Sequence, residues 1–414
     1  MQFGPFSNLK PASPGRGLSL CIIAVFAFWL APGLWRGSQP RAHVPITTKM
    51  TFNRDVVRIL QRNCLSCHHP AGIAFSLATY DEARPWAKDI EYELLRQKMP
   101  PWNAVRGFGD FINAPQLTQR DIDLIVNWTD GGTPKGEDKD LPRSPLYDSG
   151  WQLGTPDLTL KTGSESRVAA GQDKHETVSV ATGLKENRWL SAIDLNPGNA
   201  SIVHCAVFYL ENATGNGEDL FLSSWIPGQK PVRFPDGVGM LLPAGSRIKV
   251  KIHYHGGEVQ ATDQSQIGVY LARKPPARKV ALGIVNDSGT LIPTGEATRS
   301  YKTEYAVDRD CELVAIRPAA SSSIVSLQAT AYRPDGTQEV LIWARGATYD
   351  WAPVYYLRRP ARLPQGSKIE TVAYIEETES KQNGQPKEIR WSDISRDPLC
   401  ILLLATRSIV TEAR

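Results

Sequence analysis

Leu242-Pro243-Ala244-Gly245-Ser246-Arg247-Ile248 returns later in the chain as Leu363-Pro364-Gln365-Gly366-Ser367-Lys368-Ile369, at an offset of 121 residues. A second echo, Ser201-Ile202-Val203 and Ser323-Ile324-Val325, has an offset of 122 residues. Two separate matches at nearly equal spacing indicate a duplicated unit of roughly 120 residues. Around them, short β-rich runs alternate with turn residues, a pattern typical of sandwiches and jelly rolls. We therefore expect two tandem β-sandwiches in this part of the chain.

The region before the repeats has a helical pattern instead. Asn53 is placed to cap a helix over residues 55–63, whose apolar residues recur at helical spacing. A second helix is expected from Thr79 to Lys98, with Pro85 in an early turn where proline is tolerated. A third is expected to begin at Thr118 and to end at Gly131-Gly132. This pattern predicts a small all-α domain before the sandwiches.

Cys64-Leu65-Ser66-Cys67-His68 follows the first of these helices. A C-x-x-C-H pentapeptide is the attachment site of a c-type haem: two thiols bind the vinyl groups and the histidine ligates the iron. A thioredoxin-like redox pair would not need His68. Half of a zinc site would need two more soft ligands nearby, and the next cysteine is Cys205. The motif therefore predicts covalent haem on Cys64 and Cys67, with His68 as an axial ligand.

Met99 is the favoured second axial ligand. It lies in the proline-stiffened Met99-Pro100-Pro101-Trp102 stretch, some thirty residues after His68. His69, Met50 and His43 are the alternatives, although His69 adjoins the proximal ligand and cannot easily reach the opposite haem face. His/Met ligation raises the reduction potential and favours electron relay. From Thr51 to Pro134 this layout resembles the class I cytochromes c.

The N-terminus predicts export. Lys10 and Arg16 precede an apolar run from Leu18 to Leu30, which suits a signal peptide. Read on to Trp35, the run is a marginal membrane anchor, so a membrane tether through residues 18–35 is the alternative. Because this kind of haem attachment takes place outside the bacterial cytoplasm, we expect a periplasmic or otherwise exported protein. The net charge of +4 gives no indication of nucleic-acid binding.

The β-rich region resembles the bacterial copper type II, ascorbate-dependent monooxygenase-like proteins, relatives of peptidylglycine and dopamine β-monooxygenases. The resemblance rests on Trp151–Asp157, the Ile202-Val203-His204 run, Pro243-Ala244-Gly245 and His253-Tyr254. Some members of that family carry an N-terminal cytochrome c. The resemblance implies two jelly rolls, each with one copper ion.

The first copper position is only partly retained. The family's histidine pair corresponds to His204 and Cys205, and its His-Tyr pair begins at His253. His255 projects from the same strand face as His253, so these four residues are the candidate ligands of one copper ion. Equally, His253 and His255 fit a solvated strand face, and His204 fits an apolar core. Adjacent His204 and Cys205 point to opposite faces unless the strand is bulged.

The second copper position is lost. The residues that match its ligands are Pro318-Ala319-Ala320-Ser321 and Leu399, and no histidine or methionine follows His255. The two remaining cysteines of this region, Cys311 and Cys400, are candidates for a disulfide in an oxidising compartment. We see no P-loop, dinucleotide fingerprint or nucleophile elbow. Whether the chain is an enzyme, and with which catalytic residues, therefore stays open.

These observations predict an exported haem protein that passes electrons to or from a partner protein or small reductant. Its double jelly roll would be a scaffold, with at most one copper ion. The alternative is a monooxygenase in which the haem donates electrons to the single copper centre. A third hypothesis is a binding module whose haem senses redox state. The expected segments are a signal or anchor at 1–45, a cytochrome c domain at 50–134, a linker at 135–150, and jelly rolls at 151–275 and 276–414.

Overall fold

The computed structural model describes residues 48–70, 72–115, 117–145, 150–212, 219–234, 237–285, 291–292, 298–320, 324–346, 351–376, 389–390 and 400–408. The predicted signal or anchor and His43 lie outside these residues. Within the described ranges, no helix has the length and apolar character needed to span a bilayer. The described residues form one compact unit.

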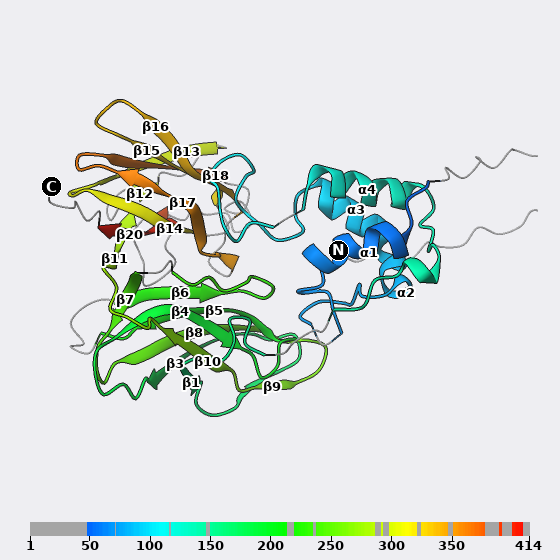
Figure 1. Ribbon diagram of the computed structural model, residues 1–414, viewed down its shortest axis with the longest axis horizontal. Coiled ribbons are helices and arrows are strands. Elements are labelled where there is room, and N and C mark those ends of the chain that lie inside the picture. Colours follow the sequence, from blue (N-terminus) through cyan, green and yellow to red (C-terminus); the bar gives the residue numbers. More distant parts are fainter. Residues whose placement is uncertain are drawn as a thin grey trace, which may run out of the picture. The chain divides into compact units, whose positions relative to one another are not determined.

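Helices occupy the first part of the described chain (Figure 1). In order they are η1 (Phe52–Val56), α1 (Val57–Asn63), α2 (Tyr80–Ala83), η2 (Arg84–Trp86), α3 (Ala87–Leu95), α4 (Gln119–Asp130) and η3 (Asp138–Asp140). Thr79 and Thr118 each close a capping box, as their positions predict. Pro85 lies within η2, which joins α2 to α3. Asn53 does not cap the first helix, because it is buried inside η1.

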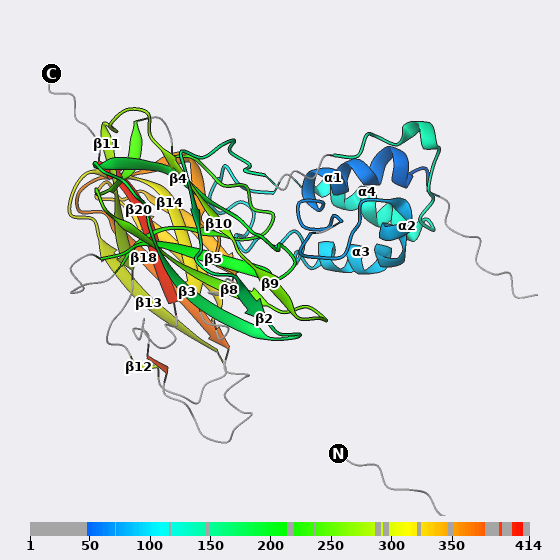
Figure 2. The same ribbon diagram turned by 90° about the horizontal axis from the view of Figure 1, so that it is seen from below.

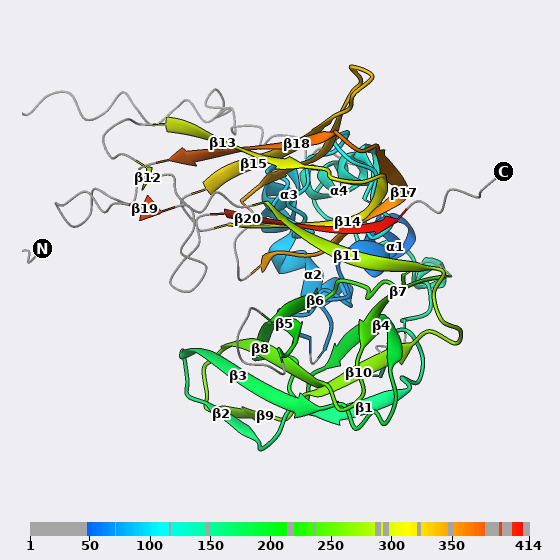
Figure 3. The same ribbon diagram turned by 90° about the vertical axis from the view of Figure 1, so that its left-hand side faces the viewer.

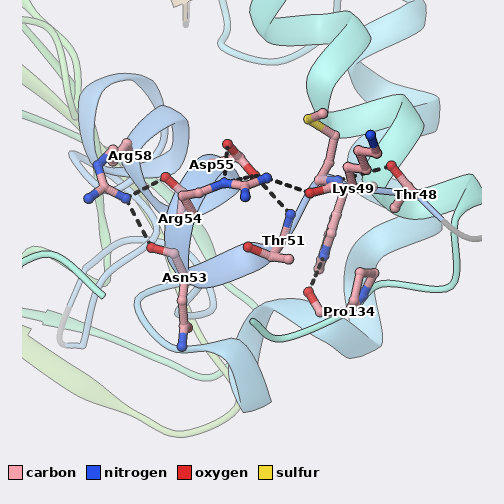
Figure 4. Close-up of polar contacts among 10 residues, drawn as sticks. Thr48, Lys49, Thr51, Asn53, Arg54, Asp55, Arg58 and Pro134 are labelled. Atoms are coloured by element: carbon pink, nitrogen blue, oxygen red, sulfur yellow. Dashed lines mark hydrogen bonds and ion pairs between the residues drawn. The ribbon is translucent and has the colours of Figure 1, made fainter. Parts of the chain in front are cut away.

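Polar contacts surround the start of η1, where no side chain caps the helix (Figure 4). The backbone N–H of Thr51 donates to the Asp55 carboxylate at 2.9 Å, and an Arg58 guanidinium nitrogen donates to the Asn53 carbonyl at 3.0 Å. The indole N–H of Trp128, in α4, donates to the Pro134 carbonyl at 3.0 Å. Phe52, Leu60, Ile125 and Trp128 are fully buried together, so η1 and α1 are fixed against α4.

Twenty strands follow in the described ranges. In the first half they are β1 (Leu158–Lys161), β2 (Ser166–Val168), β3 (Asp173–Ala181), β4 (Arg188–Asn196), β5 (Val203–Leu210), β6 (Leu220–Trp225), β7 (Val238–Leu242), β8 (Arg247–His255), β9 (Ala261–Asp263) and β10 (Gln266–Leu271). In the second half they are β11 (Arg278–Val285), β12 (Leu291–Ile292), β13 (Thr298–Ala306), β14 (Cys311–Ala320), β15 (Ile324–Tyr332), β16 (Gln338–Arg345), β17 (Tyr355–Leu363), β18 (Lys368–Glu376), β19 (Ile389–Arg390) and β20 (Cys400–Ser408).

The strand order repeats, as the sequence echoes predict. One four-stranded sheet has the order β3-β8-β5-β6, and its counterpart has the order β13-β18-β15-β16. The eight-stranded sheet reads β1-β10-β4-β7 and then β11-β20-β14-β17, joined where β7 and β11 pair in parallel. Each strand of the first half thus corresponds to the strand of the second half whose number is ten higher, for example β3 to β13. Figures 2 and 3 show the sheets from two further directions, and the β-rich part is compatible with jelly rolls.

Each half buries one face of its four-stranded sheet against the long sheet. Phe208 and Val250 share a core with Ile267 and Val269 of β10. In the second half, Leu327 and Ala373 share a core with Leu313 and Leu404. The quoted repeats are the turns that lead from β7 into β8 and from β17 into β18. Their glycines, Gly245 and Gly366, adopt positive φ values of 70° and 83°, which glycine tolerates best.

Residues 102–114, between α3 and α4, leave the helices and join the second sandwich. Ala104 and Phe111 form isolated bridges with Ala344 and Leu357, and both are buried in that sandwich's core. The Val105 N–H donates to the Trp343 carbonyl at 2.7 Å. We call residues 102–114 the strap.

The prediction of a small, separate all-α cytochrome c domain is therefore wrong. Strands make up 42% of the structure and helices 15%, so the molecule is predominantly β-sandwich. The helical pattern read from the sequence gave no sign that the strap between two of its helices completes a sandwich core. That shared core is the physical reason why the helices do not form a separate domain.

Candidate functional site

The Cys64–His68 turn follows directly from α1. The Cys64 N–H donates to the Leu60 carbonyl at 2.8 Å, and the N–H groups of Cys67 and His68 both donate to the Cys64 carbonyl, at 3.1 and 3.0 Å. Leu65 is 2% exposed and fixes the turn to the helical core. The backbone therefore brings both cysteines and the histidine of the motif into one turn, as the spacing requires.

His68 is held by its Nδ1 atom. This nitrogen lies 3.0 Å from the Phe75 carbonyl oxygen. A carbonyl oxygen only accepts, so Nδ1 carries the proton and Nε2 is the unprotonated nitrogen of the neutral ring. Burial lowers the pKa of His68, although the hydrogen bond to Phe75 opposes that shift. The ring is therefore neutral at pH 7, with Nε2 in the form that ligates a metal.

Aromatic side chains adjoin this histidine. The Phe75 ring lies edge-on to His68 at 4.8 Å between centroids and stacks on Trp86 at 4.1 Å. Phe75 is 46% exposed and Trp86 is 40% exposed. An exposed apolar group beside a ligand-ready histidine is the kind of surface that a flat apolar cofactor would cover.

Neither cysteine of the turn is poised as a nucleophile. Cys64 and Cys67 are free and half-buried. Burial raises the pKa of Cys64 to about 12 and also raises the pKa of Cys67. Both thiols therefore stay protonated at neutral pH, whereas a thioredoxin-like pair requires a thiolate. The chemistry of this turn argues against the redox-pair interpretation.

Met99 follows α3 and is 43% exposed, and its N–H donates to the Glu93 carbonyl at 3.4 Å. Its role as the second axial ligand stays a prediction. Of the alternatives, Met50 packs partly buried against the helical core, and His69 Nδ1 lies 2.7 Å from the Pro70 carbonyl oxygen.

The candidate copper ligands lie on the first sandwich. His204 and Cys205 are in β5, and His253 and His255 are in β8. The pairing register shifts between Val203 and Cys205, so the strand is bulged there and Cys205 pairs with His253. The His204 and His253 rings lie 5.0 Å apart between centroids. Cys205 is buried, and His255 is 65% exposed at its side chain.

Two residues of β3 extend this group, and the sequence interpretation did not include them. His175 pairs with His253 in register, and their rings stack at 4.2 Å with an interplanar angle of 7°. Asp173 Oδ1 lies 2.9 Å from His255 Nδ1 and 3.3 Å from His253 Nε2. His175 is exposed. Only the β3–β8 pairing brings residues about eighty positions apart together.

These contacts are hydrogen bonds and ring stacking. In the described part of the chain, no three His, Cys, Asp or Glu side chains are arranged to hold a metal ion. The copper site stays a prediction.

The predicted Cys311–Cys400 disulfide is wrong. Cys311 is a free, buried thiol. In the β14–β20 ladder, Cys311 lies opposite Ser408, whereas Cys400 lies opposite Ala320 at the other end. Nine residues of strand separate the two positions by about 30 Å, far beyond the roughly 7 Å between Cα atoms that a disulfide allows. An antiparallel ladder places the two cysteines at its opposite ends.

Part of the stretch matched to the lost second copper site can be placed. Pro318, Ala319 and Ala320 end β14, and both alanines are almost fully buried. The neighbouring Arg317 is also buried, and its Nε donates to the Ala352 carbonyl at 2.9 Å. Ser321 and Leu399 lie outside the described residues.

Comparison with known proteins identifies no family. No family model matches the chain, and no curated protein matches it. The solved structures with some similarity include the major capsid protein P2 of bacteriophage PM2, at 11% identity and a TM-score of 0.29, covering 62% of this chain and 98% of that one. Peptide:N-glycanase F matches at 12% identity and a TM-score of 0.28, covering 61% and 96%. At such scores neither likeness carries an argument.

The resemblance to class I cytochromes c fused to copper monooxygenase-like proteins is therefore not upheld. Neither a family model nor a curated protein supports it, and the chain is mainly β with no separate helical cytochrome domain. Short motifs such as Pro243-Ala244-Gly245, a turn between β7 and β8, recur wherever strands meet and do not identify a family.

Proposed function

We propose that the protein is an exported electron-transfer protein that carries one haem covalently attached to Cys64 and Cys67. His68 ligates the iron, and Met99 is the proposed second ligand. The proposal depends on the C-x-x-C-H turn and not on membership of a cytochrome family. The electron partner is a redox protein or a small reductant.

The observation that carries the proposal is the contact between His68 Nδ1 and the Phe75 carbonyl at 3.0 Å. Histidines that ligate metals commonly donate their other ring N–H to a carbonyl or carboxylate, which fixes the tautomer and the ring orientation. Here that arrangement exists in the turn that carries both cysteines.

The surroundings of the turn also fit a haem. Phe75 and Trp86 are large aromatic residues with 46% and 40% of their surface exposed. Exposing such side chains to water is unfavourable, at about 25 cal/mol for each Å² of apolar surface. Phe75 contacts both His68 and Trp86, so a porphyrin bound at the histidine would cover apolar surface that is otherwise hydrated.

Attachment needs no oxidant. Cys64 and Cys67 would hold the haem: each thiol would add across one vinyl group, with a sulfur–carbon bond formed in place of the vinyl double bond and the thiol hydrogen transferred to the other vinyl carbon. Bound haem would supply a one-electron iron couple. The chain's contribution is to hold His68 in one tautomer and to keep both sulfurs in one turn.

Covalent haem is tested on protein produced with a haem-attachment system and exported. We expect haem to stay with the denatured polypeptide and its absorption to change on reduction. Replacing Cys64 and Cys67 together by alanine should abolish covalent haem. Cys311→Ala, at a buried thiol in the second sandwich, is the matched control and should retain it.

His68→Ala separates ligation from attachment. We expect this variant to keep covalent haem but to lose the wild-type spectrum of the axially ligated iron. Wild-type protein without covalent haem under these conditions would disprove the proposal. So would a His68→Ala variant with an unchanged reduced spectrum.

A further inference from the structure

Cys67 contacts the first sandwich. Its Sγ lies 3.6 Å from the Pro227 carbonyl oxygen, to which the thiol donates a hydrogen bond. Pro227 and Gly228 form a turn in the loop between β6 and β7. The sulfur predicted to hold haem therefore lies against a loop 160 residues further along the chain.

Gly228 packs against the same sulfur atom and leaves no room for a side chain. A Cβ atom on this residue would lie 2.4 Å from Cys67 Sγ and 3.0 Å from Ser66 Oγ. The first distance is far below any ordinary contact between carbon and sulfur. Gly228 also has a φ of +75°, which disfavours other residues. The loop therefore approaches the Cys67 sulfur as closely as it does only because residue 228 has no side chain.

The loop is anchored and is not a loose flap. The Gln229 N–H donates to the Ile226 carbonyl at 3.3 Å, and Ile226 is 4% exposed. The Gln229 side chain donates to the Val354 carbonyl at 3.1 Å, and Ser224 Oγ to the Ala352 carbonyl at 3.0 Å. Hydrogen bonds to both sandwiches thus hold the loop that carries Gly228.

We infer that Pro227 and Gly228 form one wall of the haem site and that Gly228 is a positioning residue for the Cys67 sulfur. The inference rests on the proposed haem function and deepens it: the first sandwich shields the thioether bond from water. Burial of a haem and its bonded groups from solvent is one of the protein's means of setting the reduction potential. The β-sandwich is then part of the redox site as well as a scaffold beside it.

Gly228→Ala and Gly237→Ala form a matched pair for the test. Both glycines have a φ of +75°, so alanine has the same backbone cost at either position. A Cβ on Gly237 meets no atom within 4 Å, whereas one on Gly228 meets the Cys67 sulfur. Any difference between the two variants therefore reports the contact with residues 66 and 67.

The first measurement is a double-mutant cycle on the haem-free protein. Gly228→Ala should be strongly destabilising with Cys67 present, and Cys67→Ala should restore much of the loss by removing the sulfur. We expect coupling of about tenfold in the unfolding equilibrium constant, and none between Gly237→Ala and Cys67→Ala. If Gly228→Ala alone does not fold, recovery of folding in the double variant shows the same coupling.

The second measurement is the midpoint potential of the haem-loaded variants. We expect Gly228→Ala to lower it, because displacing the loop admits water that favours the more charged oxidised iron, while Gly237→Ala leaves it unchanged. Equal potentials in the two variants, or an absent coupling, would overturn the inference. If wild-type protein takes up no covalent haem, the proposed function fails, yet the haem-free cycle still decides whether the loop holds Cys67.

Discussion

Among single residues, Asp194 makes the free energy of unfolding depend on pH. It lies in β4 with 2% of its surface exposed, and burial raises its pKa to about 6, although the Leu195 N–H donates to it at 2.9 Å. A raised carboxyl pKa favours the protonated folded state. Protonation of Asp194 therefore stabilises the folded state. This contribution to the free energy of unfolding is fully present below the unfolded pKa, near 4, and is lost as the pH rises through 6.

Asp194→Asn keeps the acceptor oxygen and removes the charge. We expect it to raise the free energy of unfolding at pH 7.5 by roughly 3 kcal/mol at most, and to change it little at pH 4. Urea unfolding at the two pH values measures the difference. A gain of equal size at both would mean that Asn packs better, and would contradict the ionisation argument.

Single residues also show where sequence reasoning stops. The strand bulge that His204 and Cys205 require is present, and the C-x-x-C-H turn forms as its spacing demands. Asp173 and His175 could not be assigned to the histidine group, because only the register of β3 against β8 places them there. Likewise, the separation of Cys311 from Cys400 depends on the direction of a ladder that their sequence spacing does not reveal.

Among the elements, the strap is the segment that the sequence least reveals. Its partners lie some 240 residues further along the chain: Asn103 Nδ2 donates to the Gly346 carbonyl at 2.8 Å, and Asn113 Nδ2 to the Val354 carbonyl at 2.8 Å. Trp102 and Phe111 pack edge-on or tilted against Tyr355, at 4.7 and 5.2 Å. No periodicity marks such a segment, since it is neither a regular helix nor a regular strand.

The strap offers neighbouring test positions with opposite burial. Phe111 is 4% exposed and Ile112 is 47% exposed. Phe111→Ala should lower the free energy of unfolding of the second sandwich by about 3 kcal/mol, and Ile112→Ala by less than about 0.5 kcal/mol. Urea unfolding with hydrogen exchange on β16 and β17 measures both. Similar small effects would show that the strap only lies on the surface.

For the whole molecule, duplication is the property that the sequence predicts best. The two quoted turns, 121 residues apart, occupy equivalent places in two sheets of identical strand order. The joining of the halves was not predictable, because it depends on the two-residue parallel pairing of β7 with β11 and on a shared cluster of Phe221, Ala315 and Val354. Each of these contacts involves only a few residues of each half, and these residues show no helical or strand periodicity in the sequence.

The shared cluster predicts that the two sandwiches unfold together. Phe221 comes from the first sandwich, is 8% exposed and contacts side chains of the second, and the Arg317 guanidinium lies 5.3 Å from its ring. Phe221→Ala should therefore weaken hydrogen-exchange protection in β5 and β14 alike, by about 3 kcal/mol. Leu220→Ala, at the adjacent residue with 42% exposure, is the control. Loss of protection confined to the first sandwich would mean that the halves are independently stable, and that the joined eight-stranded sheet does not couple them.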